Sequence, residues 1–191
     1  MQPKPPAKTE LDMAKGPRHR RTLAASVSEG DWPAYWWWRD GPVPPGDCVI
    51  VDIDGVLADA SHRQHHLDGP WRDWDSFFAD VGDDDVLDEV FELLVLLNPE
   101  LVVVALTSRP TWVSGATLDW LVKHKVRWDL LIMRPMGDFQ PSPLFKGEQT
   151  QALLECGYTP RLAIDDDMRN VRMYRDLGLP TLYIDSGYHP H

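Results

Sequence analysis

Three apolar runs in the sequence each end at side chains that carry oxygen. They are followed by Asp52-Ile53-Asp54-Gly55, by Thr107-Ser108-Arg109 and by Asp165-Asp166-Asp167. In an open α/β sheet, ligands bind beyond the carboxyl ends of the strands, so parallel strands would bring these groups to one edge. Five carboxylates gathered there would repel one another without a cation, and Mg²⁺ takes oxygen ligands and bridges to phosphate. The pattern therefore predicts a magnesium-dependent enzyme that acts on a phosphate.

The Asp52-Ile53-Asp54-Gly55 motif is the most specific of these signals. A carboxylate is a workable nucleophile toward phosphorus, so Asp52 could form an aspartyl-phosphate. Asp54 could protonate the leaving oxygen and then deprotonate the attacking water, and Gly55 permits the tight turn that brings both side chains to one pocket. A solvated loop and a calcium loop are the alternatives, but Val56 breaks the alternation of oxygen ligands that an EF-hand needs. The motif favours a catalytic pair of carboxylates.

A second group of residues could hold the phosphate. Thr107, Ser108 and Arg109 offer a hydroxyl, backbone N–H groups and a guanidinium, which bind phosphoryl oxygens through charge-assisted hydrogen bonds. Lys146, at the start of a predicted helix, could place a fixed positive charge between nucleophile and phosphate. Taken alone, the Thr-Ser pair could cap a helix, and Lys146 could be a surface lysine. The company of the other motifs favours phosphate binding for both.

Asp165 and Asp166 are the expected metal ligands after the third apolar run, either directly or through water. Asp167 could simply begin the next helix, where acidic residues are favoured. The histidines that follow the first motif could suggest zinc, but no cysteine accompanies them and an arginine intervenes. They are expected to form a polar face instead.

The intervening sequence predicts the elements that must position these residues. Apolar runs predict strands at 48–51, 101–106, 130–133, 161–164 and 181–184. Helical periodicity and glycine stops predict helices at 85–98, 114–125, 145–156 and 168–177. Alternation of strands and helices, with a fully apolar strand at 101–106, favours an α/β fold built on a doubly wound parallel sheet.

Three segments do not follow this alternation. Residues 1–30 are rich in Pro, Lys, Ala and Ser and are expected to be a disordered basic tail. Residues 31–47 form a tryptophan-rich arm, which could cover a flank of the sheet or offer a stacking platform for bases. Residues 60–84 are expected to be a small cap inserted after the first strand, over the site, within a phosphatase domain of residues 48–191.

Composition limits the partners. The chain of 191 residues has a net charge of -11, and its first 25 residues carry about +4, so the remainder is acidic. An acidic body argues against a broad nucleic-acid groove, although it permits binding of a single phosphate or one strand end. Two cysteines are too few for a disulfide framework, so a reducing, cytoplasmic location is expected. No apolar run is long enough to span a membrane, and the first residues lack the apolar core of a signal peptide.

The motifs, in this order and spacing, resemble the haloacid dehalogenase superfamily of phosphohydrolases over residues 48 to about 186. The resemblance implies a Rossmann-like sheet, magnesium, Asp52 as nucleophile and Asp54 as general acid and base. It also implies that Thr107, Ser108 and Lys146 bind the phosphate. The metal would be held by Asp52, Asp54, Asp165 and Asp166.

Within that superfamily the chain looks like the phosphatase half of polynucleotide kinase-phosphatases. The similar stretches are residues 52–63, Met133-Arg134-Pro135 with Gly137-Asp138, and residues 164–175. This resemblance implies removal of 3′-phosphates from nucleic-acid ends, with Arg63 and Arg109 contacting the phosphate. The family often places an acid shortly before the motif lysine, whereas here the nearest is Asp138. The chain has no glycine-rich kinase loop.

The leading hypothesis is thus a phosphomonoester hydrolase for nucleic-acid 3′-phosphate ends. A nucleotide or another small phosphomonoester is the alternative substrate. A non-catalytic binding protein, recognising its ligand through the arm or the tail, is the remote alternative. The oligomeric state is left open by the sequence.

Overall fold

The computed structural model describes residues 32–68 and 70–189, so the expected tail at 1–30 lies outside the described residues. Six strands form one sheet, in the order β1-β6-β5-β2-β7-β8. Their bounds are Trp36–Trp38 (β1), Asp47–Val51 (β2), Val102–Pro110 (β5), Leu130–Arg134 (β6), Thr159–Asp165 (β7) and Thr181–Tyr183 (β8). Each predicted strand is present, and β2, β5, β6, β7 and β8 run parallel. The α/β fold with a largely parallel sheet is confirmed.

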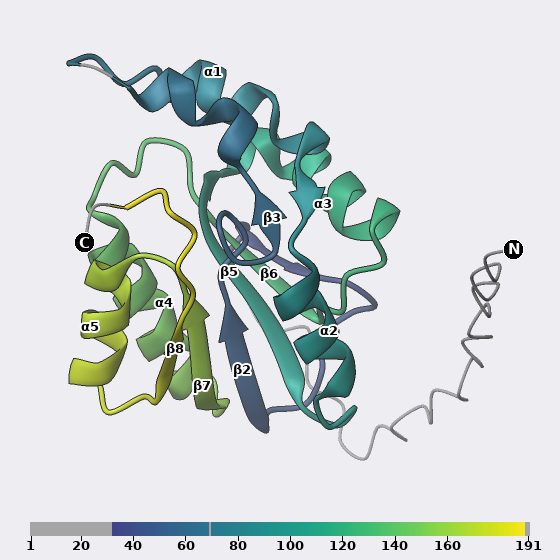
Figure 1. Ribbon diagram of the computed structural model, residues 1–191. Helices are drawn as coiled ribbons and strands as arrows, with labels where there is room; N and C mark the ends of the chain where they lie inside the picture. The colour runs from purple at the N-terminus through teal and green to yellow at the C-terminus, as the bar shows by residue number, and fades with distance from the viewer. Residues whose placement is uncertain (1–31, 69, 190–191) are drawn as a thin grey trace, which may run out of the picture.

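Helices cover both faces of the sheet, as Figure 1 shows. They are α2 (Asp88–Leu96), α3 (Ser114–Lys123), α4 (Ser142–Glu155) and α5 (Met168–Asp176). Alternate residues of the central strand β2 enter two different apolar clusters. Val49 and Val51 pack with Trp120 of α3, whereas Cys48 and Ile50 pack with Phe145 of α4. Because both faces are buried, the strand is apolar throughout.

Strand β1 departs from the prediction. Trp36–Trp38 of the tryptophan-rich arm pair antiparallel with β6, so the arm supplies an edge strand and the sheet is not wholly parallel. Trp36 is buried, and its indole N–H donates to Gln149 of α4 (2.9 Å). Trp32 stacks on Trp36, with ring centroids 5.7 Å apart. Three aromatic residues among prolines gave no period-2 pattern, so the strand was not expected.

Two other boundaries also differ. The predicted helix at 85–98 begins later, because Asp85–Val86 form strand β4, which pairs with β3 (Ala58–Asp59). Strand β5 continues past residue 106 to Pro110, with an irregular register against β6 over its last residues. The Thr107-Ser108-Arg109 motif therefore lies within the last residues of a strand.

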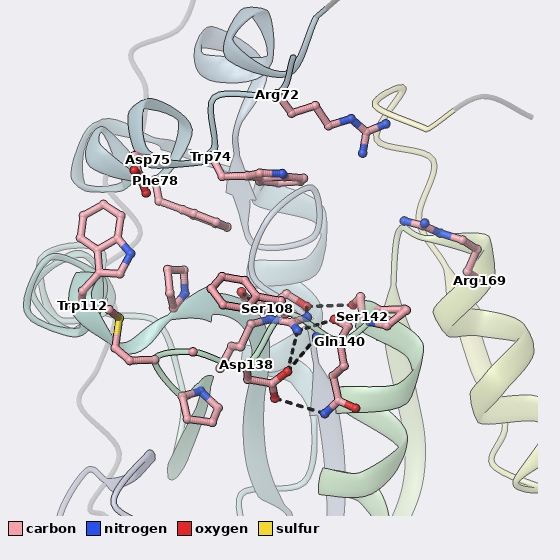
Figure 2. Close-up of a pocket in the computed structure, with 17 residues that line it drawn as sticks. Arg72, Trp74, Asp75, Phe78, Ser108, Trp112, Asp138, Gln140, Ser142 and Arg169 are labelled. Atoms are coloured by element: carbon pink, nitrogen blue, oxygen red, sulfur yellow. Dashed lines mark hydrogen bonds and ion pairs between the residues drawn. The ribbon is translucent and has the colours of Figure 1, made fainter. Parts of the chain in front are cut away.

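Between β3 and β4 the chain forms a small helical insert. It contains η1 (Ser61–Leu67), α1 (Trp74–Ala79) and η2 (Val81–Asp83), and Figure 1 shows it above the carboxyl ends of the strands. The insert and the sheet edge border a cavity of about 620 Å³. In Figure 2, Trp74 and Phe78 of the insert lie on one side of it and Ser108 on the other. In the described part of the chain, no helix is both long and apolar enough to cross a membrane.

Candidate active site

Asp52 and Asp54 follow directly on the central strand β2. The N–H of Asp52 still donates to Ile164 of β7 (3.0 Å), whereas the next N–H, that of Ile53, donates to the Asp52 carboxylate (2.8 Å). Gly55 then has φ +74°, a conformation that side chains disfavour. A Cβ at this position would lie 2.7 Å from Cγ of Asp166, so glycine lets the two loops approach closely.

Lys146 lies between two of the carboxylates that the sequence predicted. Its Nζ is 2.8 Å from an oxygen of Asp52 and 2.7 Å from an oxygen of Asp165, and its side chain is almost wholly buried. Burial alone lowers the pKa of Lys146, but Asp165 and Asp52 more than offset this and raise its pKa well above the usual value. The lysine is therefore a fixed positive charge inside the site.

Asp52, Asp165 and Asp166 form a cluster of buried carboxylates. One oxygen from each lies within 4.8 Å of the others. Burial raises the pKa of Asp52, and Asp165 and Asp166 raise it further, although Lys146 opposes them. Burial also raises the pKa of Asp165, against the influence of Lys146. Three carboxylates with one lysine carry surplus negative charge, which a divalent cation would neutralise.

The donor set fits magnesium. All three side chains offer only oxygen, the ligand that Mg²⁺ prefers. Beside them, Asn170 donates from Nδ2 to Asp165 (2.9 Å), while its buried Oδ1 has no hydrogen-bond partner. A buried oxygen without a partner is costly unless a water molecule donates a hydrogen bond to it or an ion binds it. The Asp54 carboxylate, which was also expected to hold the metal, is not part of this cluster.

The segment after β8 returns to this cluster, which the sequence did not predict. The Ser186 hydroxyl donates to Oδ2 of Asp166 (2.6 Å), and Nε2 of His189 lies 3.5 Å from the same oxygen. Tyr188 fixes the segment, because its hydroxyl donates to Asp59 of β3 (2.5 Å) and its N–H donates to the Ser186 oxygen (3.2 Å). Asp166 is thus oriented by a part of the chain that follows it by 20 residues.

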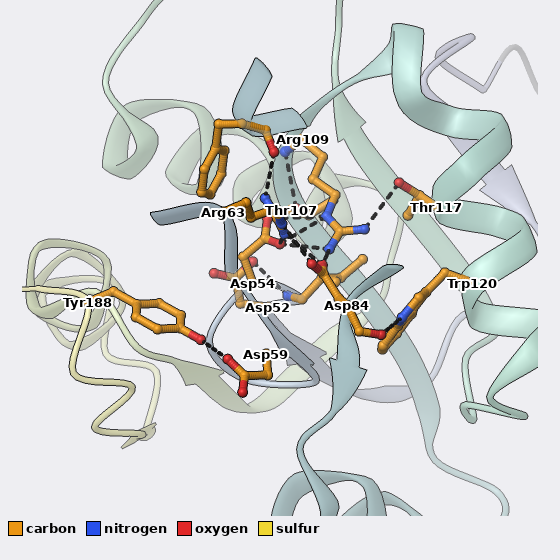
Figure 3. A network of polar contacts seen from close by, with 12 residues as sticks. Asp52, Asp54, Asp59, Arg63, Asp84, Thr107, Arg109, Thr117, Trp120 and Tyr188 are labelled. Atoms are coloured by element: carbon orange, nitrogen blue, oxygen red, sulfur yellow. Dashed lines mark hydrogen bonds and ion pairs between the residues drawn. The ribbon is translucent and has the colours of Figure 1, made fainter. Parts of the chain in front are cut away.

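Asp54 belongs to a second cluster, shown in Figure 3. Arg63 and Arg109 both donate to Asp54 and both donate to Asp84, and Arg109 lies 2.7 Å from each carboxylate. The guanidinium groups and the Asp84 carboxylate are fully buried. The two arginines balance the charge of the two aspartates, and the carboxylate oxygens all accept hydrogen bonds. Charges can be buried at low cost only when they are paired and hydrogen-bonded in this way. Asp84 was not predicted, because it lies inside the acidic run Asp83–Asp85 that gives no reason to select one member.

The two arginines determine the charge of Asp54. Burial raises the pKa of its carboxyl, but Arg109 and Arg63 outweigh burial and hold the pKa well below the usual range. Asp54 is therefore ionised in the free protein. Arg63 and Arg109 are also the residues that the family resemblance assigns to the phosphate, and in the described structure their donors go to Asp54, Asp84 and neighbouring oxygens.

The hydroxyl motif lies at the end of β5, beside the carboxylates. Thr107 is buried, and its Oγ1 accepts a hydrogen bond from the N–H of Arg109 (3.1 Å). The Ser108 hydroxyl is 2.8 Å from that of Ser142, the first residue of α4, and Arg134 also donates to it (3.1 Å). These contacts tie the end of β5 to the helix that carries Lys146.

The predicted residues thus divide into two groups at one sheet edge. Asp52, Asp165 and Asp166 gather around Lys146, whereas Asp54 is held by Arg63 and Arg109. The histidines of the insert are not brought to a metal-type cluster among residues 32–68 and 70–189. Instead, Nε2 of His62 lies 2.9 Å from the Asp84 carboxylate.

The family model of the "Polynucleotide kinase PNKP phosphatase domain" matches residues 46–189. A viral relative from Autographa californica nuclear polyhedrosis virus is 27% identical over 147 residues, covering 74% of this chain and 20% of its own length. That relative is named "Putative bifunctional polynucleotide kinase/RNA ligase". The chain therefore spans only a fifth of the relative.

Solved structures share the fold. A chain of the "Pnkp1/Rnl/Hen1 RNA repair complex" has a TM-score of 0.62 at 22% identity, over 83% of this chain and 47% of its own. A "putative had-like phosphatase" from Mesorhizobium loti has a TM-score of 0.53 at 16% identity, over 75% of both chains. With the family match over most of its length, the chain belongs to the polynucleotide kinase PNKP phosphatase domain family and is a phosphatase.

Proposed function

We propose that this phosphatase is magnesium-dependent and removes a phosphate from nucleic-acid 3′ ends through an aspartyl-phosphate on Asp52. The observation that carries the proposal is the position of Lys146, 2.8 Å from Asp52 and 2.7 Å from Asp165 within one carboxylate cluster. A fixed cation beside a nucleophilic carboxylate is suited to charge that develops on a transferring phosphoryl group.

In the first step, an oxygen of Asp52 bonds to phosphorus and the bond from phosphorus to the ester oxygen breaks, with a proton from Asp54 going to that oxygen. In the second step, water attacks phosphorus, the bond to Asp52 breaks, and Asp54 takes the proton. The arginines keep Asp54 ionised before substrate arrives, so Asp54 must take up a proton from water when the phosphate binds and give that proton to the leaving oxygen in the first step. A nearby phosphate dianion opposes the arginines and raises the proton affinity of Asp54.

Asp52, Asp165 and Asp166 would hold the magnesium ion. When bound, the ion offsets the negative charge of the phosphate and the carboxylates. Thr107 and Lys146 would bind phosphoryl oxygens, since both lie at the same sheet edge. The insert, residues 60–84, would act as the cap that limits water at this edge.

The preference for nucleic-acid ends rests on the relatives. The viral relative is named for polynucleotide kinase and RNA ligase activities, and the similar solved chain comes from an RNA repair complex. A nucleotide or another small phosphomonoester is the second candidate, because the body is acidic. The free thiols of Cys48 and Cys156 support a reducing, cytoplasmic location.

The test is release of phosphate from a 3′-phosphorylated oligonucleotide, compared with nucleoside monophosphates, with Mg²⁺ or with excess chelator. We expect the oligonucleotide to be preferred, chelation to stop turnover, and Asp52→Asn to abolish turnover in a folded protein. Turnover of mononucleotides or sugar phosphates alone would refute the polynucleotide substrate. Undiminished activity of Asp52→Asn would refute the assigned nucleophile.

A further inference from the structure

The cavity beside the phosphate-binding residues has an unusual lining. Four large apolar side chains that are exposed to solvent line it: Trp74, Trp112, Met136 and Phe139. Scattered exposed apolar residues are ordinary, but several around one concave site mark a surface that binds something. We call these four residues and the cavity that they line the aromatic cleft.

The aromatic cleft adjoins the candidate active site. Ser108 lines it and directly follows Thr107, while Ser142 lines it and begins the helix that carries Lys146. A phosphate held by Thr107 and Lys146 would therefore have the cleft next to it. The part of the substrate that carries the phosphate must occupy or pass this space.

Two indoles are partly exposed in the cleft, and one of them, Trp74, is stacked on Phe78, with ring centroids 5.8 Å apart. Trp74 and Trp112 are each 45% exposed and come from different elements, α1 and η3 (Thr111–Val113). Figure 2 shows the Trp74 ring lying across the cavity, with Trp112 at one end. Half-exposed indoles on two sides of a cavity suit planar aromatic groups, and every nucleobase has such a face.

Positive charge lies at the other end of the cleft. Arg72 and Arg169 line the cavity, and Figure 2 shows both guanidinium groups on the side away from Trp112. Two carboxylates also line the cavity, Asp75 and Asp138. Asp138 accepts hydrogen bonds from Arg134 and Gln140, so its negative charge is already partly offset. Arg169 is ion-paired with Asp167 (2.7 Å), so Arg72, beside the indoles, is the arginine that matches a backbone phosphate of a nucleic-acid strand.

From these observations we infer that the aromatic cleft binds the unpaired terminal bases of the strand whose end is dephosphorylated. Trp74 and Trp112 stack on the bases, and Arg72 meets a preceding backbone phosphate. The inference rests on the proposed function and goes further, since it names the residues that distinguish a polynucleotide end from a mononucleotide. A base-paired end cannot offer both faces of a base to the protein, so single strands are the preferred form.

The experiment measures KM and kcat for single-stranded 3′-phosphorylated oligonucleotides of one to six nucleotides, and for glycerol phosphate, which has no base. The variants are Trp74→Ala and Trp112→Ala, which lie on separate elements. Trp71→Ala is the matched control, because Trp71 is a neighbouring insert tryptophan, 87% exposed, that does not line the cavity. We expect each cleft variant to raise KM for the longer oligonucleotides by about tenfold, the effect of losing one stacked base. Glycerol phosphate turnover and the Trp71→Ala values stay unchanged.

The failures of the two proposals are distinguishable. If oligonucleotides are hydrolysed but both cleft variants match Trp71→Ala, the stacking role is wrong while the proposed function stands. If lengthening the oligonucleotide does not lower KM in the unmodified protein, or if a phosphopeptide is preferred over every oligonucleotide, the inference is also overturned. If no phosphomonoester is hydrolysed, the proposed function itself fails. Loss of glycerol phosphate turnover in both variants would assign the indoles to the fold instead.

Discussion

Nζ of Lys146 lies 2.8 Å from Oδ2 of Asp52 in the buried interior of the sheet edge. In the described part of the chain, no other lysine forms an ion pair with Asp52, the carboxylate that directly follows the central strand β2. The pair depends on α4, whose first turn is set by Pro141 before it and Pro143 within it, so the helix begins at a fixed place.

Replacing Lys146 with methionine keeps the length of the side chain and removes its charge. We expect turnover to fall by about a hundredfold or more, the size seen when one charge-stabilising group is lost. The free energy of unfolding should fall by about 3 kcal/mol, because buried Asp52 and Asp165 lose their counter-ion. Steady-state kinetics and urea unfolding measure both, with the surface variant Lys123→Met as the control.

Asp84 is expected to matter as much for stability as for activity. Asp84→Asn removes one of the two anions that face Arg63 and Arg109, so the free energy of unfolding should fall by about 3–5 kcal/mol. Turnover should fall with it, because the arginines that orient Asp54 lose their second anchor. Asp83→Asn, one residue earlier and exposed, is the matched control. Equal stability of the two variants would show that the buried pairing contributes nothing.

Ser186 is expected to tune the affinity for magnesium. Its hydroxyl orients Asp166, and losing a group that orients a metal ligand typically weakens metal affinity by about tenfold or more. Ser186→Ala should therefore need more Mg²⁺ for half-maximal turnover and bind it more weakly in calorimetry, while saturating Mg²⁺ restores kcat. Tyr188 lies in the same segment as Ser186, and Tyr188→Phe removes the hydroxyl that donates to Asp59 of β3. This variant loosens the segment but keeps the Ser186 hydroxyl, so it separates the effect of a displaced segment from the effect of losing the contact with Asp166. An unchanged Mg²⁺ affinity in Ser186→Ala would contradict the assignment.

Gly55 can be tested against a second glycine. Both Gly55 and Gly41 have positive φ, but a Cβ at Gly41 meets nothing within 4 Å, whereas one at Gly55 collides with Asp166. Gly41→Ala should cost only about 1 kcal/mol of unfolding free energy, the backbone effect. Gly55→Ala should cost clearly more and lose turnover. Similar values for both variants would mean that the loops can separate without consequence.

Strands β2, β5 and β7 and the order of their motifs could be predicted because each of these three strands contains an apolar run that ends at a functional side chain. Asp52, Asp165 and Asp166 follow such runs, so the parallel topology alone brings them together. The network around Asp54 could not be predicted in the same way. Arg63 and Asp84 lie in a polar insert without periodicity, and only the folded insert shows which of its charges turn inward.

Strand β1 and Ser186 illustrate a second limit. Both are placed by partners distant in sequence: β1 by pairing with β6, and Ser186 by reaching Asp166. Local patterns carry no information about such partners. The side chains that supply chemistry were therefore easier to predict than those that orient them.

Arg63 and Asp84 belong to the insert, whereas Asp54 and Arg109 belong to the sheet, and the four share one set of ion pairs. The insert is consequently held to the core by the same charges that hold Asp54, the proposed proton-transfer group. A variant that breaks any of these ion pairs is therefore expected to disturb the position of the insert and of Asp54 together.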